Sequence, residues 1–268
     1  MKARIKFSKN GSLIYIGHLD VMRYFQKAIR RAGLPIAFSE GFSPHMIMSF
    51  AQPLGVGMYS EGEYFDIELL EYIEPKKAID DLNKVMADGI KIKNFVYISD
   101  DKKQSGMTIV AAATYLAKLS LNKSSLDNLD MLTLEEDNNK ELKNFDNEED
   151  KIKFFNNKIQ EYFNRDEIVV LKKTKRSEKE VDIKPMILDM KYSEQGLFLF
   201  LLTGSENNLK PNLVVSDFLI FCNLPNNMLT TDYKRLDVFA KNIKKTENID
   251  NLQQENNNFI PLDACTIK

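Results

Sequence analysis

Residues 17–35 read GHLDVMRYFQKAIRRAGLP, and this stretch decides the first half of the fold. Its apolar residues recur at helical spacing, which predicts an amphipathic helix with one buried stripe. The predicted stripe consists of Leu19, Met22, Phe25, Ala28, Ile29 and Ala32. Gly33 and Pro35 predict the end of this helix, because glycine accepts a left-handed cap and proline cannot continue the helix.

The segments around this helix alternate between strand and helix patterns. Strand patterns cover residues 4–7, 36–39, 46–52, 63–70 and 90–98, and a second amphipathic helix covers residues 75–86. Apart from the short segment 36–39, their order is strand, helix, strand, strand, helix, strand, which is the ferredoxin-like split βαβ pattern. We therefore predict a first domain over residues 1–100.

A second domain with the same order of elements is predicted over residues 107–240. An acidic, Asn-rich insertion at about 124–150 interrupts it. Residues 241–268 have the composition of a flexible polar tail, with residues 259–262 as the segment that could attach it. The predicted fold class is α+β, with tandem ferredoxin-like (βαββαβ) units and antiparallel sheets.

Charge and composition limit the class of protein. The net charge is −2, yet residues 1–60 carry eight Lys/Arg against two Asp/Glu. Such asymmetry favours a surface that faces a polyanion. No apolar run reaches the ~18 residues of a membrane helix, and no secretion signal is visible, so we expect a cytoplasmic protein. Cys222 and Cys265 form no metal or redox motif and are expected to be free thiols.

Basic residues recur along the first helix. Arg23, Lys27 and Arg30 fall on one helix face, opposite the apolar stripe. A row of cations is what phosphate binding needs, although an ordinary solvated face has the same pattern. Residues 172–176 (KKTKR) form a second basic cluster, for which a solvated hairpin tip is the alternative.

Two histidines are the candidates for acid/base chemistry. His18 precedes the helix and His45 follows Ser43-Pro44 in a loop. Alternatively, His18 caps the helix and His45 hydrogen-bonds a loop carbonyl. No metal-binding spacing is present, so no metal site is predicted. Loop residues whose backbone could approach a ligand or partner are Gly41, Phe42, Ser43, Pro44, Gly55 and Gly57.

Five short blocks in the first hundred residues resemble a known family. They are residues 16–23 (IGHLDVMR), 28–35 (AIRRAGLP), 38–45 (FSEGFSPH), 49–57 (SFAQPLGVG) and 60–64 (SEGEY). Together they resemble the bacterial radical SAM-linked domain family of unknown function. Gly17 stands where that pattern has Ser, and Met46 where it has a second Pro. Residues 209–211 and 233–235 fit its C-terminal part.

The resemblance implies a partner rather than a reaction. Members of the family are typically encoded beside, or fused to, a radical SAM protein, often near genes for ribonuclease G and ribosomal proteins. The chain lacks the radical SAM cysteine motif. S-adenosylmethionine and an iron–sulfur cluster are therefore expected only in a partner, and no cofactor is expected in this chain.

Three functions are consistent with these features. The leading hypothesis is an accessory module that binds structured RNA, ribosomal or transfer RNA, and presents it to a radical SAM partner. The alternatives are an RNA-processing or RNA-modifying enzyme with His45 or His18 as acid/base, and a protein-interaction scaffold without nucleic acid. The expected RNA contacts are Arg4, Lys6, Arg23, Lys27, Arg30, Arg31, His45, Lys172, Lys173, Lys175 and Arg176. The first seven are expected to line one cationic concavity.

Overall fold

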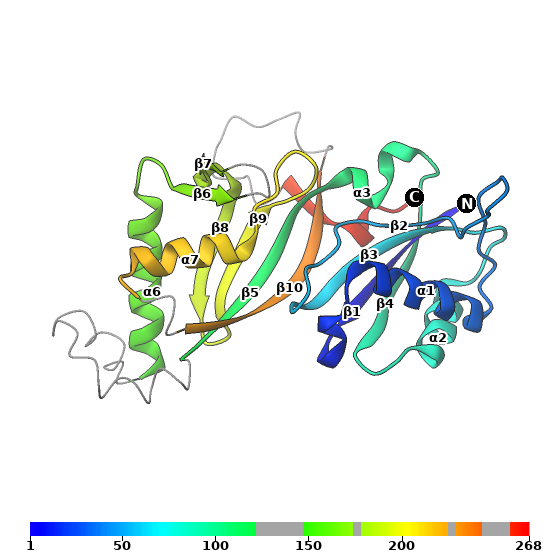
Figure 1. The fold of residues 1–268 in the computed structure, drawn as a ribbon, viewed down its shortest axis with the longest axis horizontal. Helices are drawn as coiled ribbons and strands as arrows, with labels where there is room; N and C mark the ends of the chain where they lie inside the picture. Colours follow the sequence, from blue (N-terminus) through cyan, green and yellow to red (C-terminus); the bar gives the residue numbers. More distant parts are fainter. Residues whose placement is uncertain (122–146, 174–177, 225–228, 243–257, 268) are drawn as a thin grey trace. The chain divides into compact units, whose positions relative to one another are not determined.

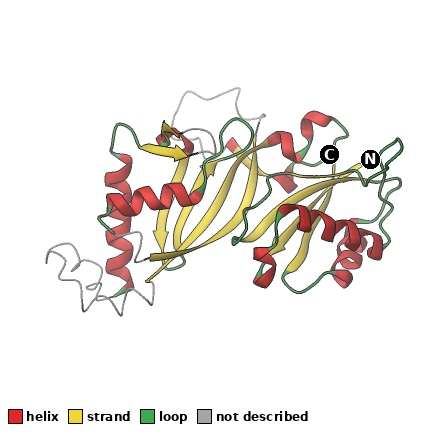
Figure 2. Ribbon diagram, in the orientation of Figure 1, coloured by secondary structure: helices red, strands yellow, loops and turns green. Residues whose placement is uncertain are grey.

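The computed structural model describes residues 1–121, 147–173, 178–224, 229–242 and 258–267 (Figure 1). The chain forms two compact units. The first consists of Met1–Thr114, Thr203–Asn208 and Lys234–Lys268, and the second of Tyr115–Leu202 and Leu209–Tyr233. Figure 2 shows helices and strands in both units, and the predicted α+β class with a mostly antiparallel sheet is confirmed. Residues 203–208 and 234–240, which the sequence assigns to the second domain, belong to the first unit.

The first unit contains a sheet in which β1 lies between β3 and β4. Its elements are β1 (Lys2–Lys9), η1 (Gly11–Tyr15), α1 (His18–Ala32), β2 (Met48–Phe50), β3 (Tyr59–Glu68), α2 (Pro75–Val85), β4 (Ile90–Ile98), η2 (Lys102–Gln104) and α3 (Gly106–Ile109). β1 pairs antiparallel with both neighbours, so that Ile5 lies opposite Phe65 and Phe95. β2 pairs antiparallel with β3, and the residues from Lys234 in β10 (Leu229–Lys241) pair with the start of β3 in parallel.

The core of the first unit lies between this sheet and the helices α1 and α2, which cover one of its faces (Figure 1). Phe25 of α1 packs edge-on against Phe7 of β1, with ring centroids 4.7 Å apart. Phe65 of β3 contacts Phe25 at 4.6 Å and stacks on Phe50 of β2 at 5.3 Å. These four rings join one helix to three strands, and so fix the position of α1 on the sheet.

The buried stripe of α1 differs from the predicted one at its start. Val21, Phe25 and Ile29 are buried at successive i, i+4 positions, whereas Leu19 is 60% exposed. Leu19 lies too far around the helix from these residues to reach the core. The predicted end is confirmed, because Gly33 adopts the left-handed conformation (φ 69°) and its N–H bonds back into the last turn.

The opposite face of the first sheet is covered by segments from the end of the chain and from residues 101–109. β11 (Phe259–Pro261) pairs antiparallel with β10, and Leu262 in η6 (Leu262–Ala264) is fully buried. The tail predicted over residues 241–268 is thus held at residues 259–262, the segment named as its point of attachment, and the described part extends over residues 258–267. Its remaining part, from residue 243 to 257, and most of the predicted acidic insertion lie outside the described residues.

The second unit contains the strand order β10-β5-β9-β8 and a separate pair of strands, β6 and β7. Its elements are β5 (Val110–Leu121), α6 (Glu148–Phe163), β6 (Val169–Lys173), β7 (Glu178–Asp182), η3 (Lys184–Met186), β8 (Ile187–Ser193), β9 (Gly196–Leu202), α7 (Pro211–Phe221) and β10. β8 and β9 form an antiparallel hairpin, with Tyr192 opposite Leu197. The strand β7 was not predicted on its own, although the hairpin tip given as the alternative for residues 172–176 implies a partner for β6. Two ferredoxin-like units in tandem are not confirmed. No described helix is long and apolar enough to cross a membrane.

Candidate functional site

Arg4 is buried and its guanidinium is fully used inside the first unit. Its Nε and Nη2 donate to the two carboxylate oxygens of Asp66 at 2.8 and 3.0 Å, and the backbone carbonyls of Leu262 and Gln104 accept further bonds. The Gly106 N–H also donates to Asp66, at 2.7 Å. Arg4 therefore cannot reach a phosphate in this structure, which corrects its predicted place on a cationic surface.

Lys6 lies two residues along the same strand and is also neutralised. Its Nζ lies 2.6 Å from Asp237 and 3.7 Å from Asp263. The Tyr64 hydroxyl donates to the same two carboxylates. The pKa of Tyr64 is raised far above its usual value. Burial is the largest cause, and the negative charge of Asp237 is the next. Lys6 is thus part of an internal polar cluster rather than of an exposed basic surface.

These two cations lie on the sheet face that α1 does not cover. Strand alternation sends Ala3, Ile5 and Phe7 into the core under α1, so that Arg4 and Lys6 point the other way. The single cationic concavity predicted from β1, α1 and the loop before β2 is therefore wrong. It fails because the sheet lies between the cations of β1 and those of α1. In addition, carboxylates from later in the chain pair with Arg4 and Lys6.

Three helix cations do lie together, as predicted. Arg23, Lys27 and Arg30 are exposed on the outer side of α1, and we call them the α1 row. Arg23 lies 3.4 Å from the Asp20 carboxylate, and both side chains are about two-thirds exposed. Arg31 instead donates to the Val85 carbonyl at 2.8 Å, which links α1 to the end of α2. The row therefore remains an exposed group of cations, as expected from the spacing of its residues.

His45 is exposed and held by one neighbour. Its Nδ1 lies 2.8 Å from the Ser39 hydroxyl, and its backbone N–H also donates to that oxygen. The Ser39 N–H donates to the His45 carbonyl at 2.8 Å. This reciprocal set closes the loop of residues 40–44, in which Gly41 has φ 107° and Phe42 is fully exposed. The predicted loop residues Ser43 and Pro44 are exposed as well.

His18 begins α1 and lies at a different place. Its ring is edge-on to Phe50, with centroids 5.1 Å apart. Phe50 ends β2, five residues after His45, so an extended chain would separate the two neighbourhoods by about 16 Å. Of the predicted loop glycines, Gly57 (φ 85°) donates to the Ile14 carbonyl, and Gly55 is exposed; their contact with a ligand or partner stays a prediction.

A pocket of about 370 Å³ opens beside His18, and every residue that lines it belongs to the first unit. Its walls come from the start of α1, from β2 and the turn after it, from α3, and from the loop of residues 203–208. Its lining includes His18, Met22, Met48, Phe50, Gln52 and Met107. Sequence reasoning singled out His18 but not this pocket, because three of its walls come from segments distant in the chain.

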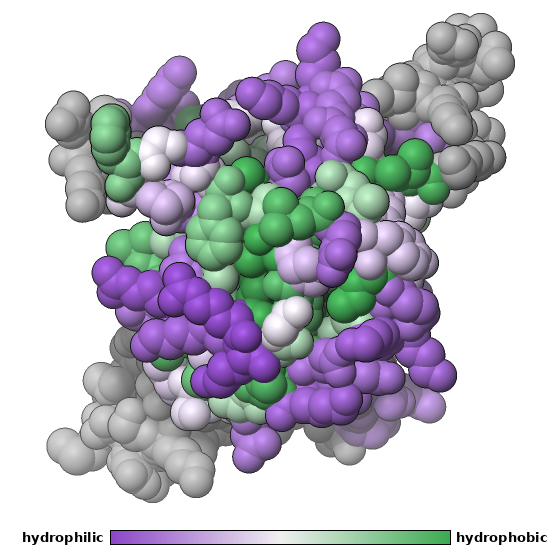
Figure 3. Space-filling view, turned by 90° about the vertical axis from the view of Figure 1, so that its right-hand side faces the viewer, coloured by the Kyte–Doolittle hydropathy of each residue, from purple (hydrophilic) through white to green (hydrophobic). Residues whose placement is uncertain are grey.

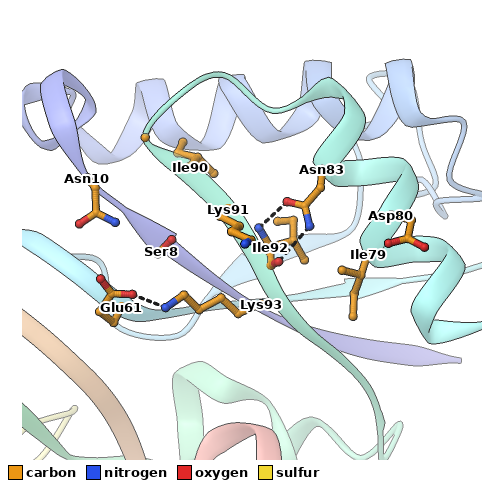
Figure 4. Close-up of a pocket in the computed structure, with 11 residues that line it drawn as sticks. Ser8, Asn10, Glu61, Ile79, Asp80, Asn83, Ile90, Lys91, Ile92 and Lys93 are labelled. Atoms are coloured by element: carbon orange, nitrogen blue, oxygen red, sulfur yellow. Dashed lines mark hydrogen bonds and ion pairs between the residues drawn. The ribbon is translucent and has the colours of Figure 1, made fainter.

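A larger hollow of about 830 Å³ lies along β4 (Figure 4). Three of its polar side chains, those of Asn83, Glu61 and Lys93, already have partners. Asn83 exchanges two hydrogen bonds with the Ile92 backbone, and Glu61 pairs with Lys93 and Lys234. Burial opposes ionisation of Glu61, but the bonds from Lys234 and Lys93 outweigh it and lower the pKa of the carboxyl.

A second buried ion pair was missed by the sequence reasoning. The Arg235 Nε donates to Glu63 at 2.7 Å, and its Nη2 donates to the Gln52 carbonyl at 2.6 Å. The Ser60 hydroxyl bonds the same carboxylate oxygen at 2.8 Å. Burial lowers the pKa of Lys9 beside this pair, while Glu63 acts in the opposite direction. The sequence contained a signal for this ion pair, because Ser60, Glu63 and Arg235 all lie in the blocks that carry the family resemblance.

The second basic cluster, residues 172–176, belongs to the second unit, whereas the α1 row belongs to the first unit. Lys172 lies in β6 opposite Lys179, and Lys173 lies opposite Glu178. The side chain of Lys173, and Lys175 and Arg176 entirely, lie outside the described residues. Their role in binding stays a prediction.

Exposed hydrophobic side chains gather at the end of the first unit that carries the N-terminus. Leu70 and Tyr72 are 74% and 64% exposed, and the Tyr72 ring stacks on Tyr97 at 5.3 Å. The Ile267 N–H donates to the Tyr97 carbonyl, and Met1 bonds the backbone of the residue before Leu70. Figure 3, which views this side, shows hydrophobic residues in the middle of the face and hydrophilic ones around them.

Metal-ligating groups are not clustered in the described part of the chain: no three His, Cys, Asp or Glu side chains there are placed to hold one ion. Of the cysteines, Cys222 is buried. Burial raises the pKa of the Cys265 thiol.

Comparison with protein families gives a match over most of the chain. Residues 2–211 match the family described as uncharacterized protein conserved in bacteria (DUF2344). The expectation of a bacterial family of unknown function is therefore confirmed, and its link to radical SAM proteins stays a prediction. No curated protein matches the chain.

Proposed function

The chain belongs to the DUF2344 family of uncharacterised bacterial proteins, and we propose that its first unit binds structured RNA through the α1 row. The observation that supports this most directly is the exposure of Arg23, Lys27 and Arg30 on one side of a helix that the core holds rigidly. Asp20 is the one carboxylate paired with the row among the described residues. An exposed pair of this kind contributes about 0–1 kcal/mol and is easily exchanged for a phosphate contact.

The spacing of the row fits a phosphate backbone. A helix rises 1.5 Å per residue, so Arg23 and Arg30 lie about 10 Å apart along the axis. Phosphates of one strand of double-stranded DNA follow one another every 3.4 Å along the axis, and on that scale the row has the length of a few phosphates. Binding by shape and backbone contact is the usual mode for duplex RNA.

In this proposal the protein is an accessory module rather than an enzyme. The resemblance to the radical SAM-linked family supports a radical SAM protein as the partner that modifies ribosomal or transfer RNA. S-adenosylmethionine and the iron–sulfur cluster would then belong to that partner. This chain would contribute recognition of the RNA and its placement.

The test is a pair of charge reversals. Lys27→Glu with Arg30→Glu should weaken binding of an RNA hairpin at least tenfold at 100 mM salt, because two phosphate contacts become repulsions. The matched control, Lys102→Glu with Lys103→Glu, changes the net charge equally at exposed residues of η2. Equal weakening by both variants would show that net charge, not the row, governs binding.

The contact between Ser39 and His45 keeps the enzyme alternative open. A hydroxyl 2.8 Å from an imidazole nitrogen is the geometry of a nucleophile beside its base, although here it also closes a loop. The alternative predicts that His45→Ala abolishes RNA turnover and leaves RNA binding intact. Equal turnover by wild type and variant would remove it.

The apolar end of the first unit favours protein docking as a second candidate function. Exposed apolar clusters mark interaction sites, and a radical SAM protein is the proposed partner. Leu70→Asp should then reduce co-purification with that partner. Ile220→Asp, at a residue 63% exposed in the second unit, is the matched control. Equal co-purification of the two variants would argue against docking at Leu70.

The order of elements also supports ferredoxin-like architecture in both units. Apart from β6 and β7, each unit has the order strand, helix, strand, strand, helix, strand. The orders β4-β1-β3, with β2 on β3, and β10-β5-β9-β8 place corresponding strands side by side. An experimental structure in which β5 pairs antiparallel with β9 and β10 would bear this out, and parallel pairing there would contradict it.

A further inference from the structure

The pocket beside His18 has the chemistry of a site for a flat, uncharged ring. Phe50 and His18 give it two aromatic walls at nearly right angles (84°). Met22, Met48 and Met107 give it three thioethers, which adapt to irregular shapes and pack well against aromatic rings. Ligand sites of this kind are mostly apolar, with a few placed polar groups.

The polar group placed most firmly in this pocket is the Gln52 amide. Its Nε2 donates to the Thr203 hydroxyl at 3.1 Å, and the backbone carbonyl of Gln52 accepts from Arg235 at 2.6 Å. Both contacts hold the residue in one orientation before any ligand arrives. In the described part of the chain no donor bonds the Gln52 Oε1, so this acceptor is available for an amino group on the edge of a ring.

The charge of the lining disfavours other classes of ligand. None of the described residues that line the pocket is an Asp, Glu, Lys or Arg. A phosphate or a carboxylate would therefore find no Lys or Arg inside it, and His18 would be the one imidazole among the described lining residues that could pair with it. A volume of about 370 Å³ lies at the lower end for ligand pockets and suits one heterocycle rather than a chain of them.

The pocket and the α1 row belong to the same helix. His18 and Met22 line the pocket, and Arg23, the first cation of the row, directly follows Met22. His18 and Arg23 are about 8 Å apart along the axis. A sugar-phosphate backbone held on the row can thus place one base beyond the helix end.

We propose that this pocket receives a single unpaired nucleobase of the RNA that lies along the α1 row. The inference rests on the proposed RNA binding and adds to it a class of substrate: a folded RNA with one unstacked base. Proteins recognise specific RNAs mainly through such splayed bases, which stack on aromatic side chains and bond through their edges.

The test compares two labelled RNA hairpins that differ only by one bulged adenosine. Stacking of one base on aromatic side chains corresponds to about 5- to 100-fold in affinity, so wild type should bind the bulged hairpin at least about fivefold more tightly. Ser205→Trp, at an exposed rim residue, fills the pocket and should abolish this preference while the paired hairpin binds within twofold of wild type.

Two further variants test whether the effect of Ser205→Trp is specific to the pocket. Ser12→Trp adds the same ring at an exposed residue of η1 outside the pocket, and should keep the preference. Met107→Asp, on the exposed rim, should weaken binding of the bulged hairpin alone. Thermal melts check that all three variants fold.

The outcomes separate this inference from the function on which it rests. Equal binding of both hairpins by wild type, or a preference that survives Ser205→Trp and Met107→Asp, overturns the base pocket and leaves RNA binding standing. Failure of wild type to bind either hairpin at low salt overturns the proposed function and the base pocket with it.

Discussion

Individual residues of the first unit divide into buried charges that stabilise the fold and exposed charges that are free to bind. Arg4 and Arg235 are each almost fully buried and each bonds a carboxylate and a backbone carbonyl. Arg23 is exposed, and its pair with Asp20 is long. Sequence composition gives all three the same charge, and burial alone separates their roles.

Arg235→Met should destabilise the protein strongly. It leaves the buried Glu63 carboxylate without its cation, which costs about 3–5 kcal/mol in the free energy of unfolding. Arg23→Met, at an exposed pair, should cost no more than about 1 kcal/mol. Urea unfolding of both variants measures the difference, and equal losses would show that the Glu63 pair contributes no more than a surface pair.

Tyr64 makes the protein sensitive to alkaline pH. Its pKa is raised in the folded state, so above pH 10 the unfolded chain loses a proton that the folded chain keeps. The stability contributed by the neutral phenol is full below pH 10 and falls by about 1.4 kcal/mol per pH unit above it.

Tyr64→Phe should therefore lower stability at pH 8, because its bonds to Asp237 and Asp263 are lost. It should also reduce the further loss between pH 10 and pH 11. Urea midpoints at these pH values check both effects. A variant whose stability falls as steeply as that of wild type above pH 10 would exclude Tyr64 as the cause.

At the scale of elements, α1 shows what local sequence can and cannot give. Its end at Gly33 and its exposed row follow from helical spacing and from glycine chemistry, and both were predicted. The burial of Val21 instead of Leu19 was not, because it depends on the direction from which β1 and β3 meet the helix. The same applies to Arg4 and Lys6, whose partners Asp66, Asp237 and Asp263 are distant in the chain.

The two glycines that flank α1 should respond oppositely to the same substitution. Gly17 has extended geometry (φ −75°) at the N-cap, so Gly17→Ser should stabilise the protein by a few tenths of a kcal/mol through a side-chain cap. Gly33 has φ 69°, so Gly33→Ser should cost about 1 kcal/mol. Thermal unfolding tests both, and a loss of stability in Gly17→Ser would contradict the cap assignment.

The C-terminal segment behaves as part of the first unit's core. Leu262→Ala should cost about 2–5 kcal/mol, since the side chain is fully buried. Ile267→Ala, at a residue 59% exposed, should change stability by no more than about 0.5 kcal/mol. Chemical unfolding distinguishes them. Two equally mild variants would mean that the segment is not held against the sheet in solution.

At the scale of the whole molecule, the sequence predicted the class of fold and most elements but not the site. Periodicity identifies strands and helices one at a time. Pairing of β10 with β3, and the return of residues 258–267 to the first sheet, involve contacts across more than 170 residues. The pocket beside His18 depends on the same long-range contacts, and local patterns therefore could not reveal it.

The central claim is that the α1 row binds RNA phosphates, and the salt dependence of affinity tests it most directly. For wild type and a hairpin RNA, log Kd should rise with log salt concentration with a slope of about 2 to 3, as expected for three released counterions. Replacing Arg23, Lys27 and Arg30 by Gln should remove most of that slope. A slope unchanged by the triple substitution would contradict the claim.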